Sequence, residues 1–164
     1  MINSGNTNNI VLAKNPVTNF KTQLQLQGIN LSNDETNKVV SLQHVKSSSQ
    51  WAASDSGDAN SNLENNFYSF SNSLNPNGPQ TSNDYFNRAA NYADSVNSYS
   101  KYYFDTEYYK KKQIVLLVKW DTQTREFIII HFDGNISNYQ KTNNLNSTRY
   151  VVVPDNIYTN FSTL

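Results

Sequence analysis

Carboxylate side chains are the residues of this sequence that could most readily act in catalysis. Glycoside hydrolysis needs two carboxyl groups that flank the scissile bond. Five carboxylates lie between residues 100 and 140, at Asp105, Glu107, Asp121, Glu126 and Asp133. Asp121 and Glu126 flank a short polar connection that also contains Arg125. Local pairing around this arginine explains the two acidic residues without chemistry, so we predict no catalytic residue among them.

A second candidate is a calcium loop in the middle of the chain. Asp58, Asn60 and Asn62 alternate as the first oxygen ligands of such a loop do. Leu63 then stands where glycine is required, and Ser69 stands where a bidentate glutamate should be. We therefore predict no metal site.

Histidine and the common catalytic motifs add no further site. His131 shares one face of an apolar segment with Phe127 and Ile129, and no nearby residue has the spacing of a base partner. We therefore interpret it as a hydrogen-bonded strand residue. The sequence contains no G-x-S-x-G, no G-x-x-x-x-G-K and no H-E-x-x-H. We expect a protein that is not an enzyme, with no cofactor and no catalytic or cofactor-binding residue.

A cluster of tyrosines and lysines resembles what single-stranded nucleic acid needs, namely stacking faces beside ammonium groups. Its members are Tyr102, Tyr103, Tyr108, Tyr109 and Lys110 to Lys112. The chain has a formal net charge of zero, so no basic surplus extends the cluster into a nucleic-acid surface. We predict no strong nucleic-acid binding and interpret the lysines as the cationic end of a helix.

Amide side chains dominate the composition. There are 27 Asn and only 10 Lys, although both belong to one AT-rich codon family, so nucleotide bias alone does not explain the excess. A polar surface with little charge suits extended contacts with other molecules. Trp51 and Trp120 together with tyrosines and amides could also bind sugar rings. Carbohydrate therefore stays a candidate ligand.

Several classes of protein are excluded. The absence of cysteine excludes a disulfide framework, a thiolate metal site and a cysteine nucleophile. Met1 to Asn9 shows neither the basic nor the apolar region of a signal peptide. The longest aliphatic run, Ile114 to Val118, is too short to cross a bilayer. We expect no membrane association.

The N-terminal half is predicted to be extended and rich in loops. Apolar and polar residues alternate from Phe20 to Gln27, as in a half-buried strand, and residues 10–13 and 38–42 are weaker strand candidates. We therefore assign residues 1–46 to an extended arm or short strands. Residues 47–82 are rich in Ser and Asn and include Asn-Pro-Asn-Gly-Pro at 75–79, so we assign them to a loop or linker.

Residues 83–164 are predicted to form a core domain of helix and sheet. Tyr and other apolar residues recur at spacings of three and four from Tyr85 to Tyr103, which predicts one long amphipathic helix that could continue to Lys112. Apolar runs at 113–120, 126–132 and 149–153 predict strands, with Leu116 and Ile129 in the core. The expected fold class is α+β, an antiparallel sheet of three or more strands with one long helix.

These features favour a structural component of a large assembly, such as a virion or capsid. The extended segments would bind neighbouring protein subunits, and ordering them would be compensated only in the assembly. The alternative is a binding module for carbohydrate or for one protein, such as an adhesin-like domain or a small inhibitor. That alternative predicts N-terminal segments that belong to the same core.

Overall fold

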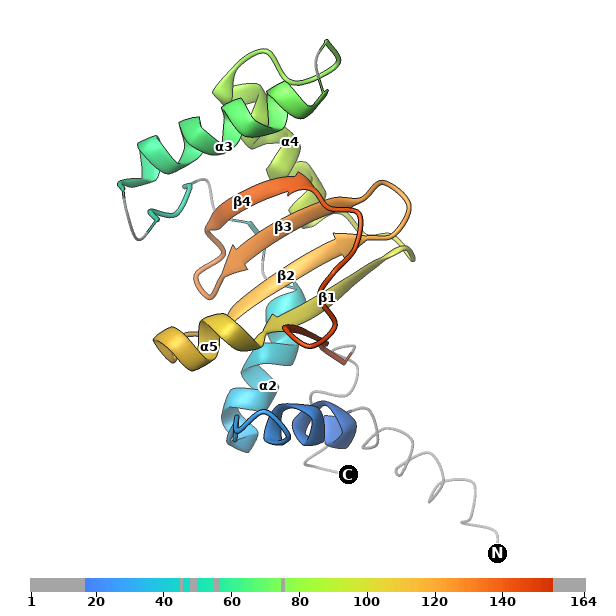
Figure 1. Cartoon of the computed structure of the whole chain (residues 1–164). Helices are drawn as coiled ribbons and strands as arrows, with labels where there is room; N and C mark the ends of the chain where they lie inside the picture. The colour runs from blue at the N-terminus through green and yellow to red at the C-terminus, as the bar shows by residue number, and fades with distance from the viewer. Residues whose placement is uncertain (1–16, 45, 48–49, 55–56, 75, 155–164) are drawn as a thin grey trace, which may run out of the picture.

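The computed structural model describes residues 17–44, 46–47, 50–54, 57–74 and 76–154. Within these residues the fold is α+β, as predicted: helices pack on an antiparallel five-stranded sheet with strand order β4-β3-β2-β1-β5 (Figure 1). The strands are β1 (Ser100–Asp105), β2 (Leu116–Asp121), β3 (Glu126–His131), β4 (Ile136–Lys141) and β5 (Tyr150–Val152). The predicted strands at 113–120, 126–132 and 149–153 correspond to β2, β3 and β5.

Helices α2, α4 and α5 are each preceded by a residue whose side chain accepts a hydrogen bond from an amide of the first turn. The elements are a helix over residues 17–25, α2 (Asn33–Ser41), a 3₁₀ turn η1 (Leu42–His44), α3 (Ala59–Leu74), α4 (Ser82–Asp94) and α5 (Thr106–Lys112). Ser32 and Glu35 form a reciprocal capping box at the start of α2. Thr81 caps α4, and Asp105 caps α5 by accepting from the Tyr108 amide.

One face of the sheet carries two separate clusters of buried side chains. Residues opposite each other on neighbouring strands point to the same face. The register places seven buried apolar side chains on this face, namely Phe104, Leu117, Ile128, Ile130, Ile136, Tyr139 and Val151. The helix over 17–25 and α2 cover the side of β1 and β5. Helices α3 and α4 cover the side of β3 and β4 (Figure 1).

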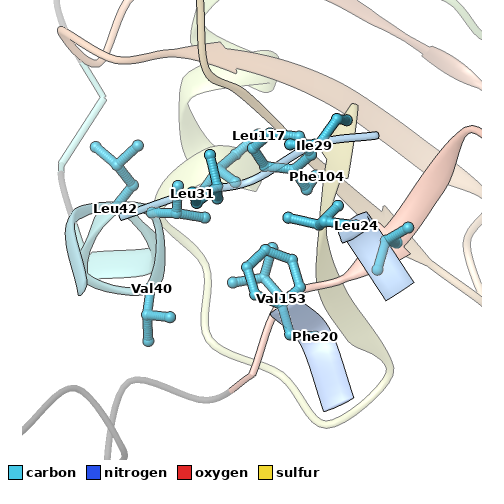
Figure 2. Close-up of a cluster of buried hydrophobic side chains, with 11 residues drawn as sticks. Phe20, Leu24, Ile29, Leu31, Val40, Leu42, Phe104, Leu117 and Val153 are labelled. Atoms are coloured by element: carbon cyan, nitrogen blue, oxygen red, sulfur yellow. The ribbon is translucent and has the colours of Figure 1, made fainter. Parts of the chain in front are cut away.

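The two clusters differ in composition. The aliphatic cluster lies under the N-terminal helices (Figure 2) and consists of Phe20, Leu24, Ile29, Leu31, Val39, Val40, Leu42, Phe104, Leu117, Val151 and Val153. The aromatic cluster lies under α3 and α4 and consists of Trp51, Phe70, Tyr85, Ala89, Tyr92, Ala93, Ile128, Ile130, Ile136 and Tyr139.

The opposite face of the sheet is crossed by the connection from β4 to β5. Because β4 and β5 are the two edge strands, residues 142–149 run from one edge to the other, in front of the sheet in Figure 1. Trp120 Nε1 donates to the Thr142 carbonyl at 2.8 Å. At the other end Arg149 forms a two-pronged ion pair with buried Asp105, with both N–O distances at 2.9 Å. These contacts hold the connection against this face.

The long helix predicted from Tyr85 is the main error in the C-terminal half. Helix α4 ends at Asp94, Ser95 has extended backbone, and the chain then forms β1 and the short α5. The Ser- and Asn-rich residues 95–100 have low helix propensity, and residues 100–105 gain a ladder with β2. Val96, which the pattern placed on the helix face, is almost fully exposed.

The N-terminal predictions are corrected where the structure describes the chain. Residues 17–25 are helical, not the strand expected over 20–27, and residues 38–42 lie in α2 and the first position of η1. Val17, Phe20 and Leu24 are buried at helical spacing, so packing on the sheet selects the helix over the alternating pattern. The strand candidate at 10–13 lies outside the described residues.

Helix α3 was missed inside the predicted loop at 47–82. Its Asn- and Ser-rich sequence has little intrinsic helix preference. Leu63, Phe67, Phe70 and Leu74 nevertheless recur at spacings of four, three and four, and all four pack in or against the aromatic cluster. This spacing of apolar residues is the feature of the sequence that could have predicted the helix.

Candidate functional site

A cleft lined mainly by polar and charged residues lies at one end of the sheet, beside α4. It has a volume of about 760 Å³ and is walled by α4, the turn at residues 95–99 and the β2–β3 turn at residues 122–125. We call it the α4 cleft. Its lining residues are Asp84, Asn87, Arg88, Asn91, Tyr92, Ser95, Asn97, Tyr99, Asp121, Gln123, Thr124 and Glu126.

Asp121 ends β2 and organises the turn that follows it. Its Oδ1 accepts hydrogen bonds from the amides of Gln123 at 2.7 Å and Thr124 at 2.9 Å, and Oδ2 accepts from Ser100 Oγ at 3.3 Å. Burial acts to raise the pKa of Asp121, but these hydrogen bonds outweigh it and lower the pKa. Asp121 is therefore a fixed, ionised acceptor, which is the opposite of what a general acid requires.

Glu126 begins β3 on the other side of the same turn. Its carboxylate accepts from the hydroxyl of buried Tyr139 and from Thr124 Oγ1, the latter at 2.7 Å. Burial, together with the hydrogen bond to Glu126, raises the pKa of Tyr139, so the phenol stays a donor. The tyrosine thus comes from the aromatic cluster and orients a carboxylate at the edge of the cleft.

The structure brings Asp121 and Glu126 into one cleft, but not through Arg125. The Arg125 guanidinium donates instead to the Asn143 carbonyl at 2.8 Å. The partners of the two carboxylates are the turn amides, two hydroxyls from Ser100 and Thr124, and Tyr139. The sequence showed the acidic pair and its spacing but not these partners. Asp105 lies elsewhere, bound to Arg149.

Amides and one exposed ring complete the α4 cleft. Four amide side chains line it, from Asn87, Asn91, Asn97 and Gln123. Tyr99 is 54% exposed. Asn97 Oδ1 accepts from the Tyr99 backbone amide at 2.9 Å, which orders the turn that carries the ring. The cleft therefore offers donors, acceptors and an aromatic face together.

A second hollow of about 720 Å³ adjoins the first and is lined in part by Lys119, so we call it the Lys119 hollow. Lys119 is only 1% exposed, and its Nζ donates to the carbonyls of Tyr92 at 2.8 Å and Ser95 at 2.6 Å. Burial lowers the pKa of Lys119 to about 8, although Asp94, Glu126 and Asp121 act in the other direction. The ammonium thus binds the carbonyl end of α4.

The structure separates the two tryptophans that the sequence offered for sugar binding. Trp51 is buried against Tyr85 and Phe86 in the aromatic cluster. Trp120 lies on the opposite face of the sheet, bound to Thr142. They cannot form one binding site.

The tyrosines and lysines of the proposed stacking cluster are also dispersed. Tyr102 and Tyr103 point to opposite faces of β1 because they are neighbours on a strand. Tyr109 packs against Phe104, and Lys110 binds Gln27. No continuous stacking surface results.

The remaining candidates have structural roles or none. Asp58 accepts from the Ser61 amide at the start of α3, whereas the Asn62 amide group donates to Ala52 and Ser137. Within the described residues no three His, Asp or Glu side chains are placed to hold a metal ion. His131 Nε2 is buried with no hydrogen-bond partner in that part of the chain, unlike the bonded histidine we expected.

Comparisons with known proteins supply no relative. The chain matches no protein-family model, no curated protein and no solved structure. Across the described part of the chain, every helix is too short or too polar to span a membrane. The geometry of the cleft is therefore the basis of the proposed function.

Proposed function

We propose that this protein is a carbohydrate-binding module and that the α4 cleft is its binding site. The observation that carries the proposal is the lining of one cleft by four amide side chains, the exposed ring of Tyr99 and the fixed carboxylates of Asp121 and Glu126. It is one of the two hypotheses that the sequence suggested, now attached to particular residues.

The chemistry of the cleft fits sugar hydroxyls. Each hydroxyl donates one hydrogen bond and accepts others, so it pairs well with amides, which do both, and with carboxylates, which only accept. Asp121 and Glu126 are already held by protein donors. Little side-chain freedom remains to be lost on binding, which favours affinity.

The ring of Tyr99 supplies the apolar part of the interaction. Sugar rings carry C–H groups on one face, and an aromatic ring can cover them while its hydroxyl stays in water. Tyr99 lies on a turn tied to the sheet, since Thr122 donates its amide to the Tyr99 carbonyl at 3.1 Å. The ring can thus act as a fixed platform beside the amides.

A structural component of a large assembly, such as a virion, is the second candidate. It is favoured by the face of the sheet opposite the helices, where Val152 is 46% exposed and Tyr103, Trp120 and Tyr150 are partly exposed. Exposed apolar surface of this kind suits a protein partner. The expected arms support it less, because the described residues 17–44 pack on the sheet.

The test is binding of Tyr99→Ala and Asn91→Ala to immobilised oligosaccharides and in calorimetry. Tyr99→Ala should weaken binding about tenfold, the loss of roughly 1.4 kcal/mol of ring contact. Tyr68→Ala is the matched control, since Tyr68 is similarly exposed on α3 away from the cleft. Equal binding by all three variants would reject the α4 cleft as the site.

The same experiment separates binding from hydrolysis. A module that only binds should release no reducing ends from the oligosaccharide that it retains. Release by the wild-type protein, abolished in Glu126→Gln, would show instead that the carboxylate pair is catalytic.

A further inference from the structure

The turn at residues 95–99 forms one wall of the α4 cleft, and a buried lysine holds its first residue. Ser95, Asn97 and Tyr99 of this turn line the cleft. Ser95 follows α4 with extended backbone, so the chain leaves the helix there. The Ser95 carbonyl accepts from Lys119 Nζ at 2.6 Å, and among the described residues it has no other donor. The start of this wall therefore depends on one ammonium group.

The same ammonium group closes the carbonyl end of α4. Lys119 Nζ donates to the Tyr92 carbonyl at 2.8 Å. It lies 3.1 Å from Ser95 Oγ and 3.4 Å from the Ala93 carbonyl. The last carbonyl groups of a helix have no partner within the helix, so a buried one needs a donor from elsewhere. Lys119 comes from β2 and supplies this donor both to the end of α4 and to the cleft wall.

The proton on Lys119 decides whether these hydrogen bonds are complete. An ammonium group carries three protons and a positive charge, which shortens and strengthens its hydrogen bonds. A neutral amine has one proton fewer and turns a lone pair towards an acceptor. The Ser95 carbonyl is affected most by this loss, because the Tyr92 carbonyl also accepts from the Ser95 amide at 3.1 Å and the Ser95 hydroxyl at 2.7 Å.

Groups on all the surrounding elements act on this proton. Burial lowers the pKa of Lys119 to about 8. Three carboxylates, from α4, the end of β2 and the start of β3, act to raise this pKa, namely Asp94, Asp121 and Glu126. The rings of Tyr92 and Tyr102 also face the ammonium. Burial raises the pKa of both phenols, so they stay neutral over the range in which Lys119 titrates.

We propose that Lys119 is a positioning residue for the α4 cleft and that loss of its proton weakens ligand binding there. The far end of the turn is held independently, since Thr122 donates its amide to the Tyr99 carbonyl at 3.1 Å. Deprotonation therefore loosens the wall at Ser95 but leaves the Tyr99 ring in place, so binding weakens without being abolished. This inference rests on the proposed carbohydrate binding and names how pH regulates the site.

The first measurement needs no ligand. Carbon-13 NMR of the full chain follows Lys119 Cε and the Ser95 carbonyl carbon from about pH 7 to about pH 9.5, a range above ordinary histidine titration and below ordinary tyrosine titration. We expect both signals to titrate together with a midpoint near pH 8. A Lys119 signal that does not titrate in this range, or a Ser95 carbonyl that does not follow it, would overturn the inference.

The second measurement is the affinity of the wild-type protein for the immobilised oligosaccharides that it retains at about pH 7. This affinity should fall about fivefold over the same pH range, at the lower end of couplings between sites. Lys119→Met should bind weakly and without this pH dependence. The control Lys111→Met removes an exposed lysine of α5, away from the cleft, and should keep the wild-type profile.

Ser95→Ala tests the same geometry with the lysine in place, which covers the case that Lys119→Met does not fold. The variant lacks one acceptor of the ammonium. The pKa of Lys119 should therefore fall further, and the midpoint of the affinity profile should move to lower pH. An unchanged midpoint would contradict the proposed role of Lys119.

These outcomes separate the inference from the proposed function. Retention of oligosaccharide with a flat pH profile in the wild-type protein would reject the role of Lys119 alone. Retention of no oligosaccharide would reject carbohydrate binding, and the NMR titration would then decide by itself whether the proton of Lys119 fixes the turn.

Discussion

The two clusters on the face of the sheet that the helices cover differ in the strands beneath them. The aliphatic cluster lies over β1, β2 and β5, and the edge strand β5 has only three residues. The aromatic cluster lies over β3 and β4, and β4 is an edge strand. An edge presents backbone groups that need partners.

Hydroxyl and amide side chains supply those partners at β4. The Tyr85 hydroxyl donates to the Tyr139 carbonyl at 2.6 Å and accepts from the Tyr139 amide at 3.2 Å. The amide of Asn62 donates to the Ser137 carbonyl at 3.0 Å. The tyrosines and asparagines that make the sequence unusual thus have a structural use here, because they pack and cover an edge at once.

The largest expected effect on stability comes from removing a large side chain from the aliphatic cluster. Phe104 is fully buried against Phe20 and Tyr109. Phe104→Ala should lower the free energy of unfolding by about 3 to 5 kcal/mol, since a cavity remains. Urea unfolding followed by circular dichroism measures this. A loss below 1 kcal/mol would mean that the N-terminal helices do not pack on the sheet.

Two neighbouring isoleucines on β3 allow the contribution of the aromatic cluster to stability to be compared with that of the opposite face of the sheet. Ile128 is fully buried under α3 and α4, whereas Ile129 points to the other face and is partly exposed. Ile128→Ala should lose about 2 to 5 kcal/mol of unfolding free energy, and Ile129→Ala less. The reverse order, measured by the same unfolding, would contradict the register of β3.

Lys119 lies where the two clusters meet, between Tyr92 and Tyr102. Its pKa of about 8 in the fold is below the ordinary 10.5, so the unfolded chain binds more protons between these values. Stability should therefore rise with pH from 8 towards 10, by at most about 3 kcal/mol for a shift of this size.

Urea unfolding at pH 7 to 10 checks this, with Lys119→Met as the variant that should lose the rise. Measurements stop at pH 10 because buried Tyr85 and Tyr139 have raised pKa values, so that ionisation of tyrosine favours the unfolded chain above that pH. A rise of equal size in Lys119→Met would assign the effect to other groups.

The smallest effect should come from removing one hydroxyl at the covered edge. Tyr85→Phe keeps the ring but leaves the Tyr139 amide and carbonyl without their partner. We expect a loss of about 1 to 3 kcal/mol of unfolding free energy. Tyr68→Phe on the exposed side of α3 is the matched control and should stay within about 0.5 kcal/mol. Hydrogen exchange at Tyr139 should quicken only in Tyr85→Phe.

The α+β class and three of the strands could be predicted because apolar runs such as residues 114–118 have few alternatives to a buried strand. Strand β4 was missed because Ile136–Lys141 is polar at most positions. Of the core candidates, Leu116 is buried but on the face away from the helices, and Ile129 is only partly buried. Of the candidate site, the sequence pointed only to the acidic pair Asp121 and Glu126. Tyr99 and the amide side chains belong to no recognisable sequence motif, so they could not be assigned to a site.

The sequence by itself determined the class of fold, the neutral charge and the positions of the apolar strands, because these follow from composition and local periodicity. Only the tertiary structure decided that residues 17–25 are helical, that α4 stops at Asp94 and that Asp121, Glu126 and Tyr99 meet in one cleft. The physical reason is that a period-two and a period-3.6 pattern can occupy the same residues, and long-range burial and strand pairing choose between them.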